Sequence, residues 1–70
     1  MAKYFYQENG KNIYVKNIDF PNSKLTFTEN ENEAYDGRNG YYADAFKDQL
    51  KTLFSEEYPQ MKHVKVDADW

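Results

Sequence analysis

Cysteine is absent from this 70-residue chain, which also has only two prolines and three glycines. Without cysteine there is no disulfide bond and no thiolate chemistry, as is typical of a reducing compartment. No apolar run approaches the roughly 18 residues that a membrane-spanning helix needs, and the first four residues lack the apolar stretch of a signal peptide. We therefore expect one soluble, cytoplasmic domain over residues 1–70, with no membrane partner.

Aromatic residues are abundant instead. Phe, Tyr and Trp account for 13 of the 70 residues, and seven of these are tyrosine. Each large aromatic side chain carries a surface of about 150–250 Å². In a chain with few Leu, Ile and Val residues, we expect aromatic side chains to supply much of the core.

The net charge of −3 is unevenly distributed. Residues 1–28 carry four basic and two acidic side chains, a net of +2, whereas residues 29–70 carry five basic and ten acidic side chains, a net of −5. Duplex DNA is bound largely through basic contacts to phosphates. The acidic excess therefore argues against binding of duplex DNA.

An N-terminal β-hairpin is the clearest predicted element. Asn9-Gly10 separates two β-rich runs, residues 3–8 and 11–18, and this dipeptide suits a type I′ turn because both central residues need positive φ. The two-residue loop fixes the register, in which Phe5 faces Tyr14. Side chains alternate between the two faces of a strand, and the residues on the face that we assign to the core are Tyr4, Tyr6, Ile13 and Val15.

Residues 24–28 predict a third strand after a turn. Ile18 breaks the alternation of the second strand, which predicts a bulge near Asn17. After the third strand, Thr28 and Glu31 match a capping box. They predict a short helical turn that ends before Gly37.

The main helix is predicted over residues 41–57, with Asn39 as its N-cap and Pro59 beyond its end. A last strand is predicted over residues 62–67, and Trp70 is expected to pack on the core. The helix carries one apolar stripe that should face the sheet, formed by Tyr42, Phe46, Leu50, Leu53 and Phe54.

These elements predict an α+β fold of order β-β-β-α-β. It is a two-layer sandwich in which one long helix covers one face of a mostly antiparallel sheet. We expect the fourth strand to pair with the first and to run parallel to the first and third, because the helix carries the chain back over the sheet. The other face of the sheet is then left without a helix.

The first candidate site lies on that uncovered sheet face. Phe5 and Tyr14 are predicted to point outward there, flanked by Lys3 and Lys16. Aromatic rings beside lysines suit protein interfaces and the stacking of bases in single-stranded nucleic acid, and they also form stabilising cross-strand pairs. A protein partner is the leading hypothesis, single-stranded nucleic acid is the alternative, and self-association through an edge strand is the third. Monomer and homodimer both remain open.

The second candidate site is an acidic segment with no basic residue between positions 29 and 37. Such a surface imitates the phosphates of a nucleic acid and would block an enzyme that binds nucleic acid. Alternatively, acidic side chains near the start of a helix complement its dipole. The residues of this segment are Glu29, Glu31, Glu33 and Asp36.

No pattern in the sequence indicates catalysis, a cofactor or a metal. His63, the only histidine, is predicted on the outward face of the last strand and has no Ser or Cys partner in any motif. An EF-hand loop centred on Gly37 would need a glutamate where the chain has Ala43. We therefore predict a non-enzymatic protein without a metal or cofactor.

Four short segments are spaced along the chain, in the order Leu25-Thr26-Phe27-Thr28, Glu33-Ala34, Tyr58-Pro59 and Val64-Lys65-Val66. Together with the N-terminal hairpin they resemble small uncharacterised proteins of phages and prophages in Gram-positive bacteria. The resemblance implies an accessory role, in which the protein binds and modulates a host or phage protein. It carries over no functional residue.

Overall fold

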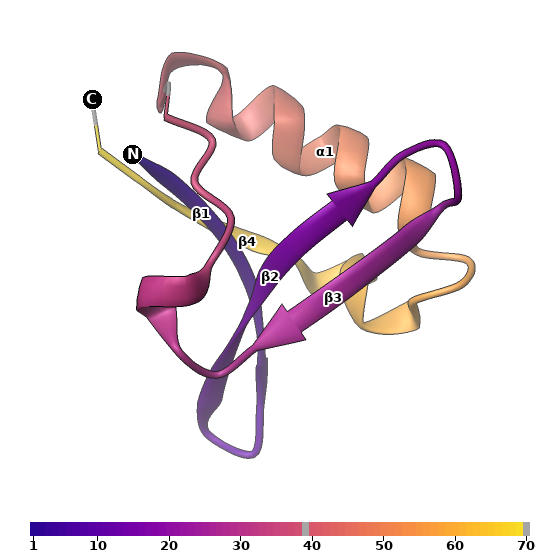
Figure 1. The fold of residues 1–70 in the computed structure, drawn as a ribbon, viewed down its shortest axis with the longest axis horizontal. Helices are drawn as coiled ribbons and strands as arrows, with labels where there is room; N and C mark the ends of the chain where they lie inside the picture. Colours follow the sequence, from indigo (N-terminus) through magenta and orange to yellow (C-terminus); the bar gives the residue numbers. More distant parts are fainter. Residues whose placement is uncertain (39, 70) are drawn as a thin grey trace.

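A computed structural model describes residues 1–38 and 40–69 (Figure 1). It shows a small α+β fold, in which an α-helix packs against a four-stranded antiparallel sheet of strand order β3-β2-β1-β4. The predicted cap Asn39 and the predicted packing of Trp70 lie outside the described residues. In chain order the elements are β1 (Ala2–Glu8), β2 (Lys11–Asp19), β3 (Lys24–Thr28), η1 (Glu31–Glu33), η2 (Gly40–Tyr42), α1 (Ala43–Phe54), η3 (Pro59–His63) and β4 (Lys65–Ala68).

The predicted hairpin is confirmed. Asn9 and Gly10 both have positive φ, at 51° and 78°, as a type I′ turn requires. The ladder between β1 and β2 runs from this turn to the pair formed by Phe5 and Tyr14. The predicted bulge is also present, because the pairing of β2 with β3 shifts register just before Asn17.

Gly10→Ala is expected to lower the free energy of unfolding by about 1–2 kcal/mol, because a residue with a Cβ resists left-handed φ. A Cβ at this position would meet no other atom within 4 Å, so the loss of stability measures the strain of the backbone conformation alone. Gly10→Asn is the control, since asparagine tolerates this conformation better. Urea unfolding followed by circular dichroism measures both variants, and an alanine variant as stable as the parent would contradict the turn.

Beyond Phe5 and Tyr14, β1 and β2 separate, and residues 29–38 enter the gap. We call residues 29–38 the connecting segment. Its Tyr35 N–H donates to Val15 O at 2.9 Å, and its Gly37 N–H donates to Ala2 O at 2.8 Å. In Figure 1, β1 with β4 and β2 with β3 diverge from the hairpin, with the connecting segment between them. The continuous β1–β2 ladder that the register predicts therefore ends early.

β4 pairs with β1 as predicted, but the predicted parallel direction is wrong. β4 is antiparallel to β1, with Ala68 opposite Ala2 and Lys65 opposite Phe5. The prediction assumed that the helix alone carries the chain from the end of β3 back to the opposite end of the sheet. Instead, the connecting segment first carries the chain back along the sheet to Ala2. α1 then crosses the open end of the diverging strands, and β4 runs back toward Ala2 (Figure 1).

The helix presents a narrower face to the core than its apolar stripe predicts. Leu50 and Phe54 are buried as expected, at 0% and 2% exposure, but Tyr42 and Leu53 are exposed, at 62% and 53%. The prediction was wrong for Tyr42 because α1 begins one residue later, at Ala43, whose small side chain is buried. It was wrong for Leu53 because this residue points about 100° away from its buried neighbour Phe54. The buried face therefore runs through Ala43, Leu50 and Phe54, and Tyr42 and Leu53 lie beside it.

The core joins the sheet, the helix and η3. Tyr6 and Ile13, which were assigned to the core, are only partly buried. Within residues 1–38 and 40–69, no helix has the length and apolar character needed to cross a membrane. The buried core residues are Ala2, Tyr4, Val15, Leu25, Ala43, Leu50, Phe54, Met61 and Val64.

Two short elements differ in detail from the prediction. The helical turn after β3 is present as η1, but its cap is Asn30, whose side chain accepts from Asn32 N–H at 3.0 Å. Thr28 stabilises the residues just before this turn, because its Oγ1 accepts a hydrogen bond from Asn30 N–H at 3.0 Å. His63 is exposed as predicted but ends η3 instead of lying on a strand, since Pro59 opens a 3₁₀ turn that delays β4 to Lys65.

Candidate functional site

The aromatic pair predicted on the sheet face is present but covered. The rings of Phe5 and Tyr14 lie 5.5 Å apart. However, Tyr14 is only 7% exposed, and its hydroxyl lies 3.5 Å from Glu31 Oε1 of η1. The prediction that Tyr14 points into solvent is therefore wrong, because the connecting segment covers the face that the helix leaves open. In this arrangement Tyr14 does not offer its ring to a base or a partner.

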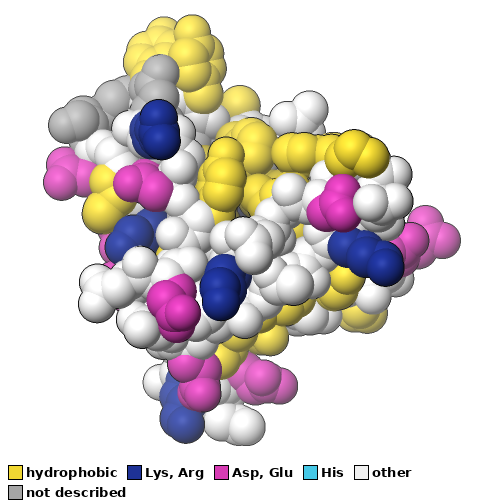
Figure 2. Space-filling view, in the orientation of Figure 1, with side chains coloured by type: hydrophobic (Ala, Val, Ile, Leu, Met, Phe, Trp, Pro, Cys, Tyr) yellow, Lys and Arg dark blue, Asp and Glu magenta, His cyan; other side chains and the backbone are white. Residues whose placement is uncertain are grey.

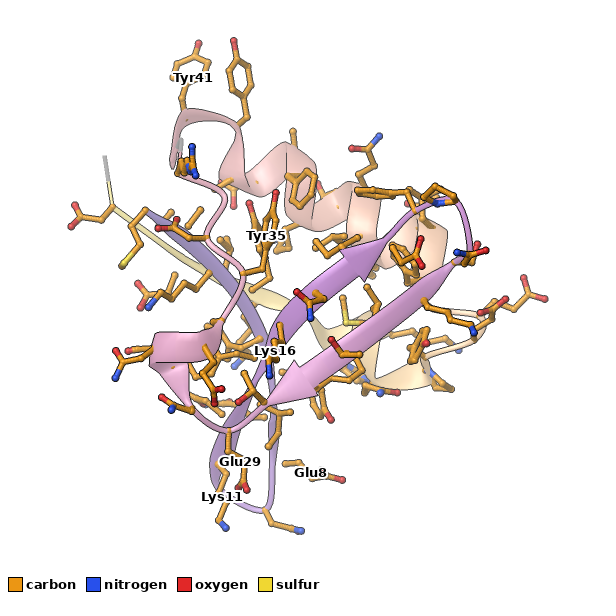
Figure 3. All side chains as sticks on the ribbon, viewed as in Figure 1. Glu8, Lys11, Lys16, Glu29, Tyr35 and Tyr41 are labelled. Carbon is orange, nitrogen blue, oxygen red and sulfur yellow. The ribbon has the colours of Figure 1, made fainter. Side chains whose placement is uncertain are left out.

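The structure brings the two candidate sites together into one. The acidic connecting segment lies against the lysines of the sheet face. Figure 3 shows Lys16 beneath the connecting segment and Lys11 beside Glu29 near the hairpin end. The contacts are Lys3 Nζ to Glu31 O at 3.0 Å, Lys16 Nζ to Glu33 Oε1 at 3.7 Å and Lys11 Nζ to Glu29 Oε1 at 3.3 Å. The first contact is a hydrogen bond to a backbone carbonyl, and the other two are exposed ion pairs. Exposed ion pairs are individually weak, but that of Lys16 with Glu33 pairs a charge of one predicted surface with a charge of the other.

Asp36, the last acidic residue of the segment, anchors the backbone. Its Oδ1 accepts from Arg38 N–H at 2.8 Å and from Ala2 N–H at 3.2 Å. These two backbone hydrogen bonds, first that of Arg38 and then that of Ala2, hold the pKa of Asp36 below its ordinary value of 3.8. Asp36 thus ties the connecting segment to the start of β1.

We expect Asp36 to make the stability of the fold depend on pH in the acidic range. Its pKa is lower in the folded state than in the unfolded state, so its contribution is complete above about pH 4 and is lost as pH falls through the folded value. Asp36→Asn keeps an acceptor oxygen but does not titrate. Urea unfolding between pH 2 and 6 should show a steeper loss for the parent than for Asp36→Asn, and parallel profiles would contradict this role.

A second surface, which the sequence analysis missed, carries exposed large apolar side chains. It lies along the outer side of α1 and the adjacent turn between β2 and β3. Phe46 connects its parts, since its ring stacks with that of Tyr35 at 6.2 Å and meets that of Phe20 edge-on at 6.4 Å. We call this the aromatic surface, and its residues are Phe20, Tyr35, Tyr42, Phe46 and Leu53.

The aromatic surface is hollowed in two places. Along α1 there is an open groove of about 690 Å³, lined by Tyr42, Ala45, Phe46, Asp48, Gln49, Thr52 and Leu53. A smaller pocket of about 200 Å³ lies toward the connecting segment, lined by Tyr4, Tyr35, Gly37, Tyr42 and Phe46. In the space-filling view, hydrophobic side chains gather between the connecting segment and α1 (Figure 2).

Part of the aromatic surface could have been found from the sequence. Neighbouring residues on an α-helix point about 100° apart, so at most one of Leu53 and Phe54 can lie at the centre of the buried face. The buried position of Phe54 therefore turns Leu53 outward. The positions of Phe20 and Tyr35 depend on tertiary contacts with Phe46, and no local pattern indicates them.

Comparison with known proteins identifies no relative: no family model, no curated protein and no solved structure matches the chain.

Proposed function

We propose that the protein is a non-enzymatic protein-binding module that acts through the aromatic surface. The observation that supports this is the exposure of three large apolar side chains on one side of a small domain: Tyr42 at 62%, Leu53 at 53% and Phe20 at 48%. Exposed apolar side chains that cluster on a folded protein commonly mark an interaction site. The sheet face, predicted first for this role, has its aromatic pair largely covered by the connecting segment.

The partner that fits the groove best is an amphipathic helix with a basic flank. The groove lies along a helix and is lined by apolar and small polar side chains, which suits the apolar face of a second helix. Its charged lining residue is the acidic Asp48, and the whole chain carries a net charge of −3. The resemblance to small phage proteins supports an accessory or inhibitory role for such a contact.

Site-specific photocrosslinking tests this proposal. A benzophenone amino acid at Leu53 should give one dominant protein adduct in a host lysate, and the same group at Glu8 should not. Glu8 is the matched control because it is exposed at the hairpin end, far from Tyr35 (Figure 3). Sedimentation of the purified protein shows whether the adduct is instead a second copy of this chain.

The purified partner then decides whether the adduct reflects binding through the aromatic surface. Tyr42→Ser and Leu53→Ser should each weaken its affinity by about tenfold or more, as expected for anchors near the centre of an interface. Glu8→Ser should leave the affinity unchanged. If all three variants bind equally well, the aromatic surface is not the contact.

A further inference from the structure

The smaller pocket of the aromatic surface has an unusual lining. Four of its five lining residues are aromatic, and Gly37 is the fifth. Its volume of about 200 Å³ is several times the roughly 30 Å³ that one water molecule occupies in the liquid. The pocket therefore has room for a small organic group.

Three of the lining rings, those of Tyr4, Tyr35 and Phe46, contact one another at one side of the pocket. Tyr4 forms the floor and is only 1% exposed. The ring of Phe46 lies 5.2 Å from that of Tyr4, and the ring of Tyr35 lies 6.5 Å from it. Tyr35 projects from the connecting segment toward α1 (Figure 3), and Tyr42, 62% exposed, forms the rim.

Gly37 packs closely against Tyr4 and Ala2 at the floor of the pocket. A methyl group added at this position would lie 3.2 Å from the Tyr4 hydroxyl, closer than most real Cβ contacts. The backbone cannot easily yield, because Gly37 N–H donates to Ala2 O at 2.8 Å. A larger residue here would crowd the Tyr4 hydroxyl at the floor.

The carboxylates of Asp36 and Asp44 act on Tyr4, and Lys3 and the N-terminal ammonium lie near Asp36. None of its lining residues is Lys, Arg or His. Burial raises the pKa of Tyr4, and interactions with Tyr35, Asp36 and Asp44 raise it further. Asp44 lies at the long distance of 4.0 Å from Lys47 Nζ, and Asp36 accepts hydrogen bonds from backbone N–H groups. The lining therefore offers no basic side chain to bind an anion.

We infer that this pocket binds a methylated ammonium group, such as the trimethylammonium group of choline or of a trimethylated lysine. Aromatic ring faces attract cations, and methylated ammonium groups lose less hydration than a free ammonium when they enter an aromatic site. The adjacent carboxylates favour a cation over a neutral group of the same shape. The inference is independent of the proposed protein partner, although Tyr35, Tyr42 and Phe46 line the pocket and also belong to the aromatic surface.

Titration of the purified protein with choline tests the inference, with 3,3-dimethylbutanol as a neutral analogue of the same shape. ¹H–¹⁵N NMR should show saturable shifts at Tyr35, Gly37 and Phe46 with choline. The neutral analogue should bind at least fivefold more weakly. Equal affinity for the two compounds, or no saturable shift with choline, would overturn the inference.

Two variants locate the binding. Phe46→Leu removes a ring but keeps an apolar side chain, and Tyr42→Leu does the same at an exposed position where folding is not at risk. Each should weaken choline binding at least threefold, whereas Leu53→Ala, outside the pocket, should not change it. Unchanged binding by both ring variants would place choline elsewhere and overturn the inference.

A peptide with trimethyllysine, compared with its unmodified form, separates the two sources of the cation. Tighter binding of the methylated peptide than of choline would indicate a modified protein as the source, and the reverse order would indicate a small molecule or lipid headgroup. These titrations use the purified chain, so they can succeed even if photocrosslinking at Leu53 finds no partner.

Discussion

Leu50→Ala is expected to leave a large fraction of the protein unfolded at 25 °C. Leu50 is fully buried in the core beneath α1. Removing a buried leucine side chain costs about 2–5 kcal/mol, and a single core in a domain of this size rarely supplies more than about 3–5 kcal/mol of stability. Urea unfolding followed by circular dichroism should show little or no native baseline.

Leu53→Ala is the matched control, because it makes the same chemical change three residues further along α1. Leu53 is 53% exposed, so its substitution should change the free energy of unfolding by less than about 0.5 kcal/mol. The sequence pattern places both leucines in one buried stripe and predicts two large losses. Similar losses for the two variants would show that the helix is rotated from the orientation described above.

Tyr14→Ala is expected to cost about 3 kcal/mol or more, as for other buried aromatic residues. Tyr14 is only 7% exposed, and its ring packs against Phe5 beneath η1. If the sheet face were open, the same change would remove only a cross-strand pair worth about 0.2–1 kcal/mol. Thermal and urea unfolding of the variant distinguish these two cases.

Tyr14→Phe separates ring burial from the contact of the hydroxyl. The distance of 3.5 Å to Glu31 Oε1 is long for a hydrogen bond between oxygens, so this variant should lose less than about 1 kcal/mol. A large loss for Tyr14→Phe together with a small additional loss for Tyr14→Ala would mean that the hydroxyl, and not the buried ring, holds the connecting segment in place.

Local sequence signals predicted the local elements well. Asn9-Gly10 fixes the hairpin and its register because few residues accept positive φ at both turn positions. The interruption at Ile18 correctly predicted the bulge. Val15, Leu50 and Phe54 were correctly assigned to the core, because strand and helix periodicity hold within a single element.

The connecting segment could not be predicted in the same way. Residues 29–38 include the one-turn 3₁₀ helix η1 and otherwise no helix or strand, so their path has no periodic signal. They are held by contacts to β1 and β2, such as the hydrogen bonds of Tyr35 and Gly37. Both large errors, the direction of β4 and the exposure of Tyr14, follow from the path of this one segment.

The contact between the two candidate sites could not be predicted for the same reason, because it depends on the path of the connecting segment. Phe5, Tyr14 and their lysines were found from the hairpin register, and the acidic residues were found from composition. Their contact with one another depends on the connecting segment and was not foreseen. Because this contact covers much of the predicted face, the exposed apolar side chains of the aromatic surface are the stronger candidate for a binding surface.

Nitration of the native protein, with each tyrosine followed by mass spectrometry, tests this account most directly. The sequence pattern predicts an exposed Tyr14 and a buried Tyr42, whereas the structure has Tyr14 at 7% and Tyr42 at 62% exposure. We expect tetranitromethane to modify Tyr42 early and to leave Tyr14 protected until the protein is unfolded in urea. Modification of Tyr14 before Tyr42 in the native protein would contradict both the covering of the sheet face by the connecting segment and the outward position of the aromatic surface.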